Sequence, residues 1–414
     1  MVNIKSIMDM DYFNKTVLLR LDINTTIDPI TKKIKSEKRI DMSLPTIQYL
    51  LDKGAKIAMI AHQGDTLDYF NLISMEEHAE KLTQKLGKKV EYIDDVCGPA
   101  AIEAVKNLKI GDMVLLGNLR YLTEEVSTFE SAVKMTAEEM TNTWLVRKLA
   151  PICDIYVNEA FSAAHRNSPS MFAFQEVLPT VGGFLLFNEI EALTNVMTNP
   201  QKPSVFVLGG LKISDAFGMM KTVLENGSCD KVLSGGVTGN IMLIAAGYDI
   251  GEANIKFIED RGLDRFIEPA KEYLSKFEDK ILYPVDLAYE NNNERCECSI
   301  DNIVNKPSLD IGQKTIEIYK NEIMNAGTIF VNGPMGVYES ELFEDGTRAV
   351  WHAVSNANGY SVIGGGDTIS AAQKYIDLKD VSYVCTAGGA MVNFLSGKEM
   401  PLIKAMKKAY LKQK

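Results

Sequence analysis

The stretch Thr16-Val-Leu-Leu-Arg20-Leu-Asp22-Ile-Asn24 joins a short apolar run to charged and amide side chains. A run of branched apolar residues of this length is typical of a buried β-strand. Arg20, Asp22 and Asn24 stand at the end of that run. Because ligands of open α/β sheets bind beyond the carboxyl ends of the strands, the stretch predicts a strand that leads into a binding site.

Runs of the same kind recur along the whole chain and alternate with amphipathic helical patterns such as Pro45–Asp52 and Met75–Leu86. Strand–helix alternation on this scale predicts parallel sheets with helices on both faces. The runs divide into two groups, so we predict an α/β protein with two doubly wound, Rossmann-like domains. The predicted strands are 16–20, 56–60, 113–116, 155–157, 204–208, 231–233, 280–283, 328–331, 361–363 and 383–385.

The length of 414 residues also indicates two domains, since one hydrophobic core rarely serves so long a chain. A boundary falls near Leu178-Pro179, before a long helical run that starts at Phe184 and reaches about Thr198. This helix and a hinge would join the two halves. The predicted division is an N-terminal domain over 1–178, an interdomain helix over 179–198, a C-terminal domain over 199–398 and a tail over 399–414.

The composition limits the classes of partner. A net charge of −11 without a basic run argues against nucleic-acid or anionic-membrane binding, so an anionic ligand would need a local cationic pocket. The six cysteines are sparse, and the one close pair, Cys296-Glu-Cys298, is not a usual zinc pattern. Neither a signal-peptide pattern nor a bilayer-length apolar run is present in the sequence. We therefore expect a cytoplasmic protein without a membrane partner.

Cationic and small polar side chains recur in the first 170 positions, each group beside an apolar run. A folded α/β domain could gather these groups at one edge of its sheet, where arginine and histidine side chains would bind a small polyanion. Asp65 does not fit such a site. The groups are 20–24, Arg39, Ala61-His62-Gln63-Gly64-Asp65, Asn118-Leu-Arg120 and Ala164-His165-Arg166.

Glycine-rich segments follow several strands of the second half. Glycines let the backbone approach a phosphate, and helix N-termini bind anions, so the set favours a nucleotide site. Lys212 could neutralise phosphate charge, Asp367 could meet Mg²⁺, and Glu339 could reach the ribose. Each segment alone could equally be a packing turn, and none has P-loop spacing. The segments are 209–215, Ser234-Gly-Gly236, 332–339, 364–368 and 386–390.

Taken in order, these motifs resemble those of the phosphoglycerate kinase family over nearly the whole chain. His62-Gln63, and the lack of a second lysine after Asp215, look like the archaeal branch of that family. The matching segments are Val17–Asn24, Asn118–Arg120, Tyr156–Phe161, Ala164–Arg166, Gly209–Asp215, Pro284–Asp286, Asp310–Gly312, Asn332–Glu339 and Gly364–Thr368.

The resemblance implies a glycolytic kinase that transfers phosphate between ATP or ADP and a carboxylate, converting 3-phosphoglycerate to 1,3-bisphosphoglycerate. Hinge closure would bring an N-terminal acid site to a C-terminal Mg-nucleotide site, and the tail would return to the N-terminal domain. The implied acid-binding residues are Asp22, Asn24, Arg39, His62, Arg120 and Arg166. The implied catalytic residues are Arg39, Lys212, Gly366 and Gly389. The implied nucleotide-binding residues are Gly210, Lys212, Asn332, Gly333, Pro334, Glu339, Gly365, Gly366, Asp367 and Thr368, with Mg²⁺ at Asp367.

One loop departs from the family pattern S-H-x-G-R-P, whose arginine holds the substrate phosphate. Here it reads Ala61-His-Gln-Gly-Asp65-Thr66, which loses a charged hydrogen bond of about 1.5–3 kcal/mol and adds repulsion. Because Arg39, Arg120 and Arg166 remain, 3-phosphoglycerate stays our first choice of substrate. Three alternatives are open: Asp65 faces solvent and another cation replaces the arginine, the substrate is a different small carboxylic acid, or the chain is a non-catalytic nucleotide-binding homologue. The sequence does not determine the oligomeric state or the physiological direction.

Overall fold

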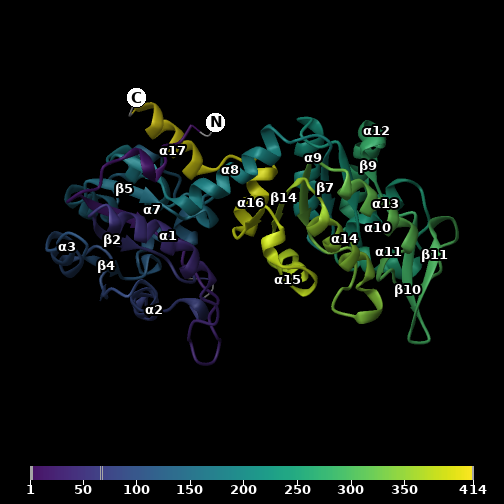
Figure 1. Cartoon of the computed structure of the whole chain (residues 1–414), viewed down its shortest axis with the longest axis horizontal. Helices are drawn as coiled ribbons and strands as arrows, with labels where there is room; N and C mark the ends of the chain where they lie inside the picture. Colours follow the sequence, from purple (N-terminus) through teal and green to yellow (C-terminus); the bar gives the residue numbers. More distant parts are fainter. Residues whose placement is uncertain (1–2, 66, 68, 413–414) are drawn as a thin grey trace. The chain divides into compact units, whose positions relative to one another are not determined.

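A computed structural model describes residues 3–65, 67 and 69–412 of the chain. The chain divides into two compact units, which are Met1–Glu191 with Glu399–Lys414, and Ala192–Lys398 (Figure 1). The division falls inside helix α8, Phe184–Thr198, which agrees with the helical run predicted from Phe184 to about Thr198, whereas residues 180–182 of the predicted interdomain helix form a strand. The functional domains predicted over 1–178 and 199–398 stay a prediction, and the last two residues of the predicted tail lie outside the described residues.

The first unit is built on a parallel sheet with the strand order β3-β4-β2-β1-β5-β6. Strands β2 to β4 lie on one side of β1, and β5 and β6 lie on the other side. The gap between β1 and β5 is therefore the topological switch point, where ligands bind in such sheets. The strands are β1 Thr16–Arg20, β2 Lys56–Ile60, β3 Val90–Ile93, β4 Met113–Leu116, β5 Ile155–Asn158 and β6 Thr180–Gly182.

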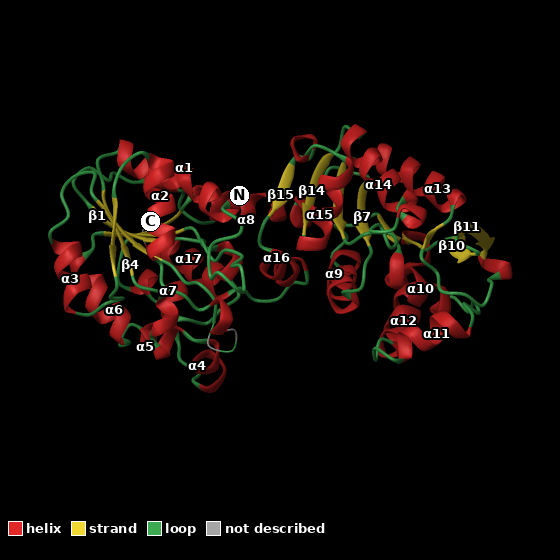
Figure 2. Cartoon of the chain, turned by 90° about the horizontal axis from the view of Figure 1, so that it is seen from below, coloured by secondary structure: helices red, strands yellow, loops and turns green. Residues whose placement is uncertain are grey.

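Every residue of β1 is buried, because helices cover both faces of the sheet (Figure 2). Val17 and Leu19 point into a core with helices α1, Lys38–Asp52, and α2, Glu76–Leu86. Leu18 points into the core on the opposite face of the sheet, to which several helices contribute residues. These helices are α3 Pro99–Lys106, α6 Trp144–Leu149, α7 Pro169–Phe172 and α17 Pro401–Lys412, and the short α4 Ser127–Ala132 and α5 Ala137–Met140 complete the unit.

Helix α17 packs within the first unit although it comes from the end of the chain. It contacts α7 and β6, and the Leu402 N–H donates to the carbonyl oxygen of Ala164 at 3.2 Å. Lys408 Nζ lies 2.9 Å from Glu176 Oε1. Met406 and Ala405 are buried. The last helix therefore completes one face of the first unit.

The second unit is also built on a parallel sheet, with the strand order β15-β14-β13-β7-β8-β9. Its switch point lies between β7 and β13. The strands are β7 Ser204–Leu208, β8 Lys231–Ser234, β9 Ile281–Leu282, β13 Thr328–Asn332, β14 Tyr360–Gly364 and β15 Tyr383–Cys385. The helices are α9 Ile213–Glu225, α10 Gly236–Ala245, α11 Glu252–Glu259, α12 Ile267–Phe277, α13 Gln313–Met324, α14 Asp345–Asn356, α15 Gly366–Tyr375 and α16 Gly388–Leu395.

The predicted α/β class with two doubly wound parallel sheets is confirmed, and the structure contains a further sheet that the sequence analysis did not predict. Strands β10, Asp286–Asn291, β11, Glu294–Ser299, and β12, Asp310–Ile311, form an additional antiparallel sheet in the second unit. The hairpin turns at Asn292-Asn293, whose φ values of 54° and 63° suit the tight turns that join antiparallel strands. The sequence analysis predicted none of these three strands; in β11, Glu, Arg and Cys stand where an apolar run would indicate a strand.

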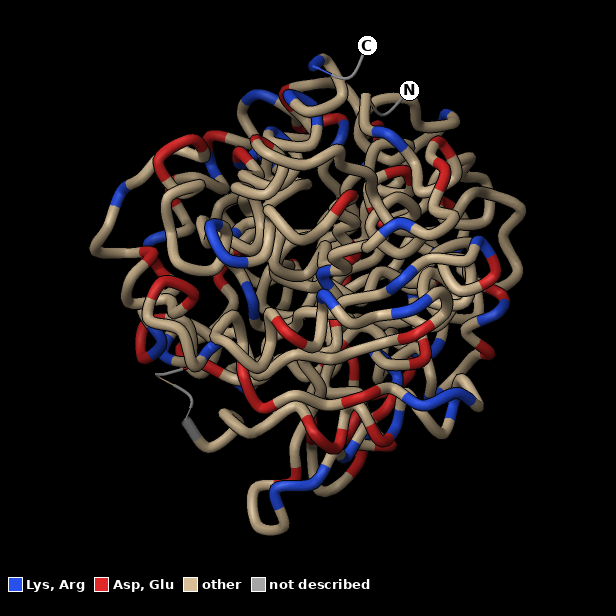
Figure 3. The backbone as a smooth tube through the Cα atoms, turned by 90° about the vertical axis from the view of Figure 1, so that its left-hand side faces the viewer, with Lys and Arg blue, Asp and Glu red and all other residues tan. Residues whose placement is uncertain are grey.

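Within the described residues, none of the helices is both long and apolar enough to cross a membrane. Acidic and basic residues are interspersed along the backbone in Figure 3.

Candidate functional site

The switch point of the first unit positions a carboxylate and an arginine. Asp22 follows β1, and Ser162 follows β5 and donates from its N–H and its hydroxyl to the Asp22 carboxylate, at 3.1 and 2.7 Å. Arg39, near the start of α1, donates to Asp22 Oδ1 at 2.5 Å and to Ser162 Oγ at 2.9 Å. The Arg39 side chain is 29% exposed, so part of this held side chain is open to solvent.

His62 lies beside the arginines at this edge of the sheet. Its Nδ1 is 2.8 Å from NH2 of the buried Arg20. Burial, and then the charges of Arg20 and Arg120, hold the pKa of His62 well below its usual range. His62 is therefore neutral at physiological pH and can act as a hydrogen-bonding group rather than a cation. His165, by contrast, is exposed.

The loop after β2 is held by amide side chains. Asn24 accepts a hydrogen bond from the Gly64 N–H at 3.1 Å, and Gly64 has a φ of +72° that favours glycine. The Asn118 side chain accepts a hydrogen bond from the Gln63 N–H at 3.1 Å and donates one to the Gln63 carbonyl oxygen at 2.8 Å. The buried His78 lies 3.2 Å from Gln63 Oε1, and burial lowers its pKa to about 4. Asn24 therefore shapes this loop, and Gln63, which the sequence analysis noted as a feature of the archaeal branch, anchors it.

Asp65 points toward the arginines. Its Oδ2 lies 3.7 Å from Arg120 NH2 and 3.6 Å from Arg166 NH1, and Ser127 donates to its Oδ1 at 2.8 Å. The Asp65 side chain is only 14% exposed. The alternative in which Asp65 faces solvent is therefore wrong.

Further carboxylates, which the sequence analysis missed, balance the arginines of this site. Arg166 NH1 lies 3.2 Å from Glu130 Oε2. Arg120 NH1 donates to the Glu125 carbonyl oxygen, and the buried Glu125 carboxylate accepts from Ser170 at 2.6 and 2.7 Å. Glu130 lies 36 residues before Arg166, and Glu125 lies 45 residues before Ser170, so local sequence contains no signal for these contacts. The predicted local cationic pocket is thus nearly charge-balanced.

The switch point of the second unit opens into a pocket of about 700 Å³. The Gly209 N–H donates to the Asn332 carbonyl oxygen at 2.9 Å, and the Gly210 N–H to the Pro334 carbonyl oxygen at 2.8 Å, so the segments after β7 and β13 lie against each other. All of the nucleotide-binding residues expected from the resemblance line this pocket, namely Gly210, Lys212, Asn332, Gly333, Pro334, Glu339, Gly365, Gly366, Asp367 and Thr368, together with Gly388 and Gly389.

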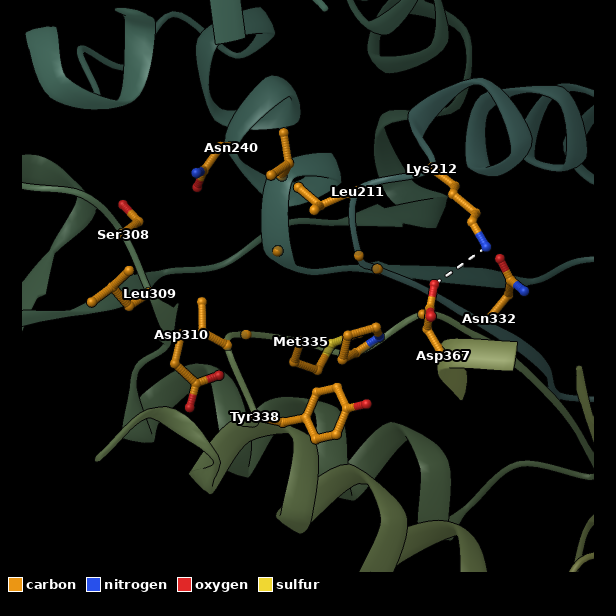
Figure 4. A pocket seen from close by; sticks show the side chains of 18 of the residues that line it. Leu211, Lys212, Asn240, Ser308, Leu309, Asp310, Asn332, Met335, Tyr338 and Asp367 are labelled. Carbon is orange, nitrogen blue, oxygen red and sulfur yellow. Dashed lines mark ion pairs between the residues drawn. The ribbon is translucent and has the colours of Figure 1, made fainter. Parts of the chain in front are cut away.

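One end of the pocket carries charge. Lys212 Nζ lies 3.2 Å from Asp367 Oδ2, and both side chains are more than half exposed (Figure 4). Asn332 donates to the Gly364 carbonyl oxygen at 2.7 Å, and Thr368 accepts from the Gly333 N–H at 2.9 Å. These bonds fix the backbone around an accessible lysine.

Glycines at the same end leave room for a ligand. No described atom beyond its chain neighbours and helix backbone lies within 4 Å of a Cβ built on Gly366 or Gly389, which lie in the first turns of α15 and α16. A Cβ on Gly209 would instead lie 2.2 Å from the Pro334 carbonyl oxygen. Free N–H groups at helix N-termini attract anions, so α15 and α16 offer phosphate positions while Gly209 serves backbone packing.

The opposite end is apolar, and the sequence analysis did not predict it. Phe257 of α11 and Arg261, in the turn after α11, line it with Leu309, and the Arg261 guanidinium stacks on the Phe257 ring at 3.7 Å from the ring centroid. Asp310 borders this end and is held by Arg295 NH1 at 3.0 Å, and burial raises its pKa to about 6. A flat apolar base and a phosphate chain could therefore occupy the two ends of one pocket.

A magnesium ion fits this chain only together with a nucleotide. Groups of three or more His, Cys, Asp or Glu side chains that could hold a metal are absent from the described residues. Mg²⁺ usually takes one or two protein carboxylates and completes its shell with phosphates and water. Asp367, at the phosphate end of the pocket, can supply such a carboxylate.

The fold and these sites place the chain in a class of proteins. This class is the doubly wound α/β proteins with a glycine-lined pocket of the kind that binds phosphate groups. A family model described as Phosphoglycerate kinase matches residues 7–398. The phosphoglycerate kinase of Methanothermus fervidus is 40% identical over 97% of this chain and 96% of that protein, and that of Pyrococcus furiosus is 38% identical over 98% and 97%. The crystal structure of phosphoglycerate kinase from Pyrococcus horikoshii matches with a TM-score of 0.85 and 37% identity over 99% of this chain and 100% of that chain.

The chain belongs to the phosphoglycerate kinase family. It is therefore a phosphotransferase with ATP or ADP as co-substrate and a carboxyl group as acceptor.

Proposed function

We propose that the first unit binds 3-phosphoglycerate and that the second unit binds ATP or ADP with Mg²⁺. The observation that carries this proposal is the contrast between the two switch points. Four arginines, of which Arg20 and Arg120 are buried, surround the first, and glycines at helix N-termini surround the second. Arginine suits the carboxylate and phosphate of a small acid, and backbone N–H groups suit a polyphosphate chain.

In the first unit, Arg39 is the residue best placed to meet the reacting carboxylate. Asp22 and Ser162 hold its guanidinium, and its side chain is partly exposed. Neutral His62 supplies a hydrogen bond without adding charge, and Asn24 shapes the adjoining loop. Arg120 and Arg166 then bind the other end of the acid.

In the second unit, Lys212 and the N–H groups around Gly366 and Gly389 stabilise the phosphoryl group during transfer. A carboxylate oxygen of the acid attacks the γ-phosphorus of ATP, and the bond to the oxygen that bridges to the β-phosphate breaks. The enzyme forms no covalent bond, so its contribution is in-line placement and charge stabilisation. When bound, Mg²⁺ neutralises phosphate charge, with Asp367 as its protein ligand and Glu339 available to the ribose.

Acyl phosphates react with water, so productive transfer requires water to be excluded. Closure about the hinge predicted from the sequence would meet this requirement. Closure, the cytoplasmic location and the absence of nucleic-acid or membrane partners stay predictions.

A coupled assay tests the function, with ATP and either 3-phosphoglycerate or unphosphorylated small carboxylic acids. We expect turnover with 3-phosphoglycerate, and a kcat about 10²- to 10³-fold lower in Lys212→Ala, the range for loss of one charge-stabilising group. Lys271→Ala, at an exposed surface ion pair, is the matched control and should retain kcat. Turnover of only an unphosphorylated acid would replace the assigned substrate. ATP binding without turnover of any acid would favour a non-catalytic homologue.

A further inference from the structure

We propose that Asp65 is an internal counter-ion that competes with the phosphate of the acid substrate for Arg120 and Arg166, and that it thereby determines how strongly the site selects a phosphorylated acid. The proposal rests on the acid site proposed for the first unit. Asp65 stands in the loop position where the family pattern has an arginine.

The Asp65 carboxylate lies between two guanidinium groups from different parts of the chain. Arg120 belongs to a short helical turn after β4, and Arg166 follows β5. Oδ2 of Asp65 is 3.7 Å from one and 3.6 Å from the other. An anion that binds both arginines must therefore approach an existing negative charge.

The two distances exceed the 2.7–3.2 Å of a direct N–H···O hydrogen bond. Asp65 thus offsets the positive charge of the arginines without accepting a direct hydrogen bond from NH2 of Arg120 or NH1 of Arg166, whose N–H groups a phosphate could use. Nε of Arg120 is buried and has no hydrogen-bond partner among the described residues. The site keeps at least one arginine donor unsatisfied while Asp65 is in place.

Other contacts hold both arginines independently of Asp65. Arg120 donates to the Glu125 carbonyl oxygen, and Arg166 NH1 lies 3.2 Å from Glu130 Oε2. Ser127 holds the Asp65 carboxylate itself, donating at 2.8 Å. Removing the charge at position 65 should therefore leave the arginines in position and change mainly the electrostatic potential that a ligand meets.

This arrangement predicts selectivity by charge. A phosphate at the distal end of the acid is repelled by Asp65 or must displace it from the arginines. A neutral hydroxyl at the same end meets no such repulsion. Asp65 therefore narrows the difference in affinity between a phosphorylated acid and its unphosphorylated counterpart.

The experiment compares the wild-type protein with Asp65→Asn, which removes the charge and keeps the shape. Dissociation constants for 3-phosphoglycerate, glycerate and ATP are measured by calorimetry, and the KM for 3-phosphoglycerate by the coupled assay. We expect Asp65→Asn to bind 3-phosphoglycerate about tenfold more tightly, by the usual strength of a charged contact, while glycerate and ATP change less than twofold. Asp65→Ser should shift in the same direction and provides a second variant if the first folds poorly.

Asp11→Asn is the matched control, because Asp11 is exposed and gives the same change in net charge. It should leave all three constants unchanged. Equal 3-phosphoglycerate binding by wild type and both Asp65 variants would overturn the counter-ion role alone. Tighter binding of glycerate by the same factor would also overturn it, because the effect would then not depend on the phosphate. Failure of the wild type and both variants to bind 3-phosphoglycerate would overturn the counter-ion role and the assigned acid together.

Discussion

The two candidate sites lie at equivalent places in two similar sheets, yet side chains form one site and mainly backbone groups form the other. In the first unit, side chains form the site, and its arginines already have carboxylate or carbonyl partners, as Arg39 has Asp22. In the second unit, glycines and helix N-termini form the phosphate end, and Lys212 is exposed beside Asp367. On the proposed function, ligand binding in the first unit would therefore depend on competition between charges, and in the second unit on space beside the backbone.

The sharpest test of this difference is the loss of one side chain from the first site. Arg39→Met should lower kcat/KM by about 10²- to 10³-fold, because the variant removes a held guanidinium and leaves Asp22 without its cation. The thermal midpoint is measured in parallel to separate catalysis from folding. Arg147→Met, an exposed arginine of α6, is the control and should retain kcat/KM. A loss of less than threefold in Arg39→Met would show that this arginine does not meet the substrate.

A pair of glycine substitutions tests the second site. Gly366→Val places methyl groups where the structure leaves open space, so we expect the KM for ATP to rise about tenfold with little change in thermal midpoint. Gly209→Ala should instead act mainly on stability. It should lower the thermal midpoint, because its Cβ would lie 2.2 Å from the Pro334 carbonyl oxygen and force the backbone to shift. Such overpacking costs about 1–3 kcal/mol. If Gly366→Val lowered stability as much as Gly209→Ala, the open space at α15 would be structural rather than a ligand position.

The smallest expected effect concerns Glu159, the residue that follows β5 in the first unit. Glu159 is fully buried, and its Oε1 accepts from Thr46 Oγ1 at 2.6 Å and from the Leu185 N–H at 3.0 Å. Burial raises its pKa to about 8, whereas the unfolded chain has the usual value of about 4.3. Between these values the folded state binds the extra proton, so the stability contributed by Glu159 decreases as pH rises from about 4.3 to about 8.

Glu159→Gln should remove this dependence. Urea unfolding at pH 5 and pH 8 should give a difference in unfolding free energy that is about 1–3 kcal/mol smaller in the variant than in the wild type. Glu91→Gln, at an exposed position of β3, is the control and should behave as the wild type. An unchanged difference in Glu159→Gln would mean that the carboxyl is ionised in the folded protein.

Local patterns predicted much of the fold and of the second site. Apolar runs located the central strands, α8 was found at its observed bounds, and glycine segments after strands indicated the pocket around Lys212. These features depend on neighbouring residues, so they can be read from short segments. The alternating polar strand β11 was missed because its partner β10, rather than apolar character, makes it a strand.

The first site was harder to predict because its properties arise between distant segments. The sequence showed arginines and one aspartate, but it could not show that Asp65 turns inward or that Glu130 would meet Arg166. Those contacts depend on tertiary packing of loops whose conformations local propensity does not determine. The class of ligand was therefore predictable, whereas the charge balance of its site was not.

The position of α17 has a consequence for the order of folding. The first unit needs Leu402, Ala405 and Met406 to finish its buried surface, yet the whole of the second unit, Ala192–Lys398, is synthesised before them. A chain leaving the ribosome can complete its second unit while the first still exposes an apolar face. The enzyme thus acquires a finished first unit only when its last helix docks.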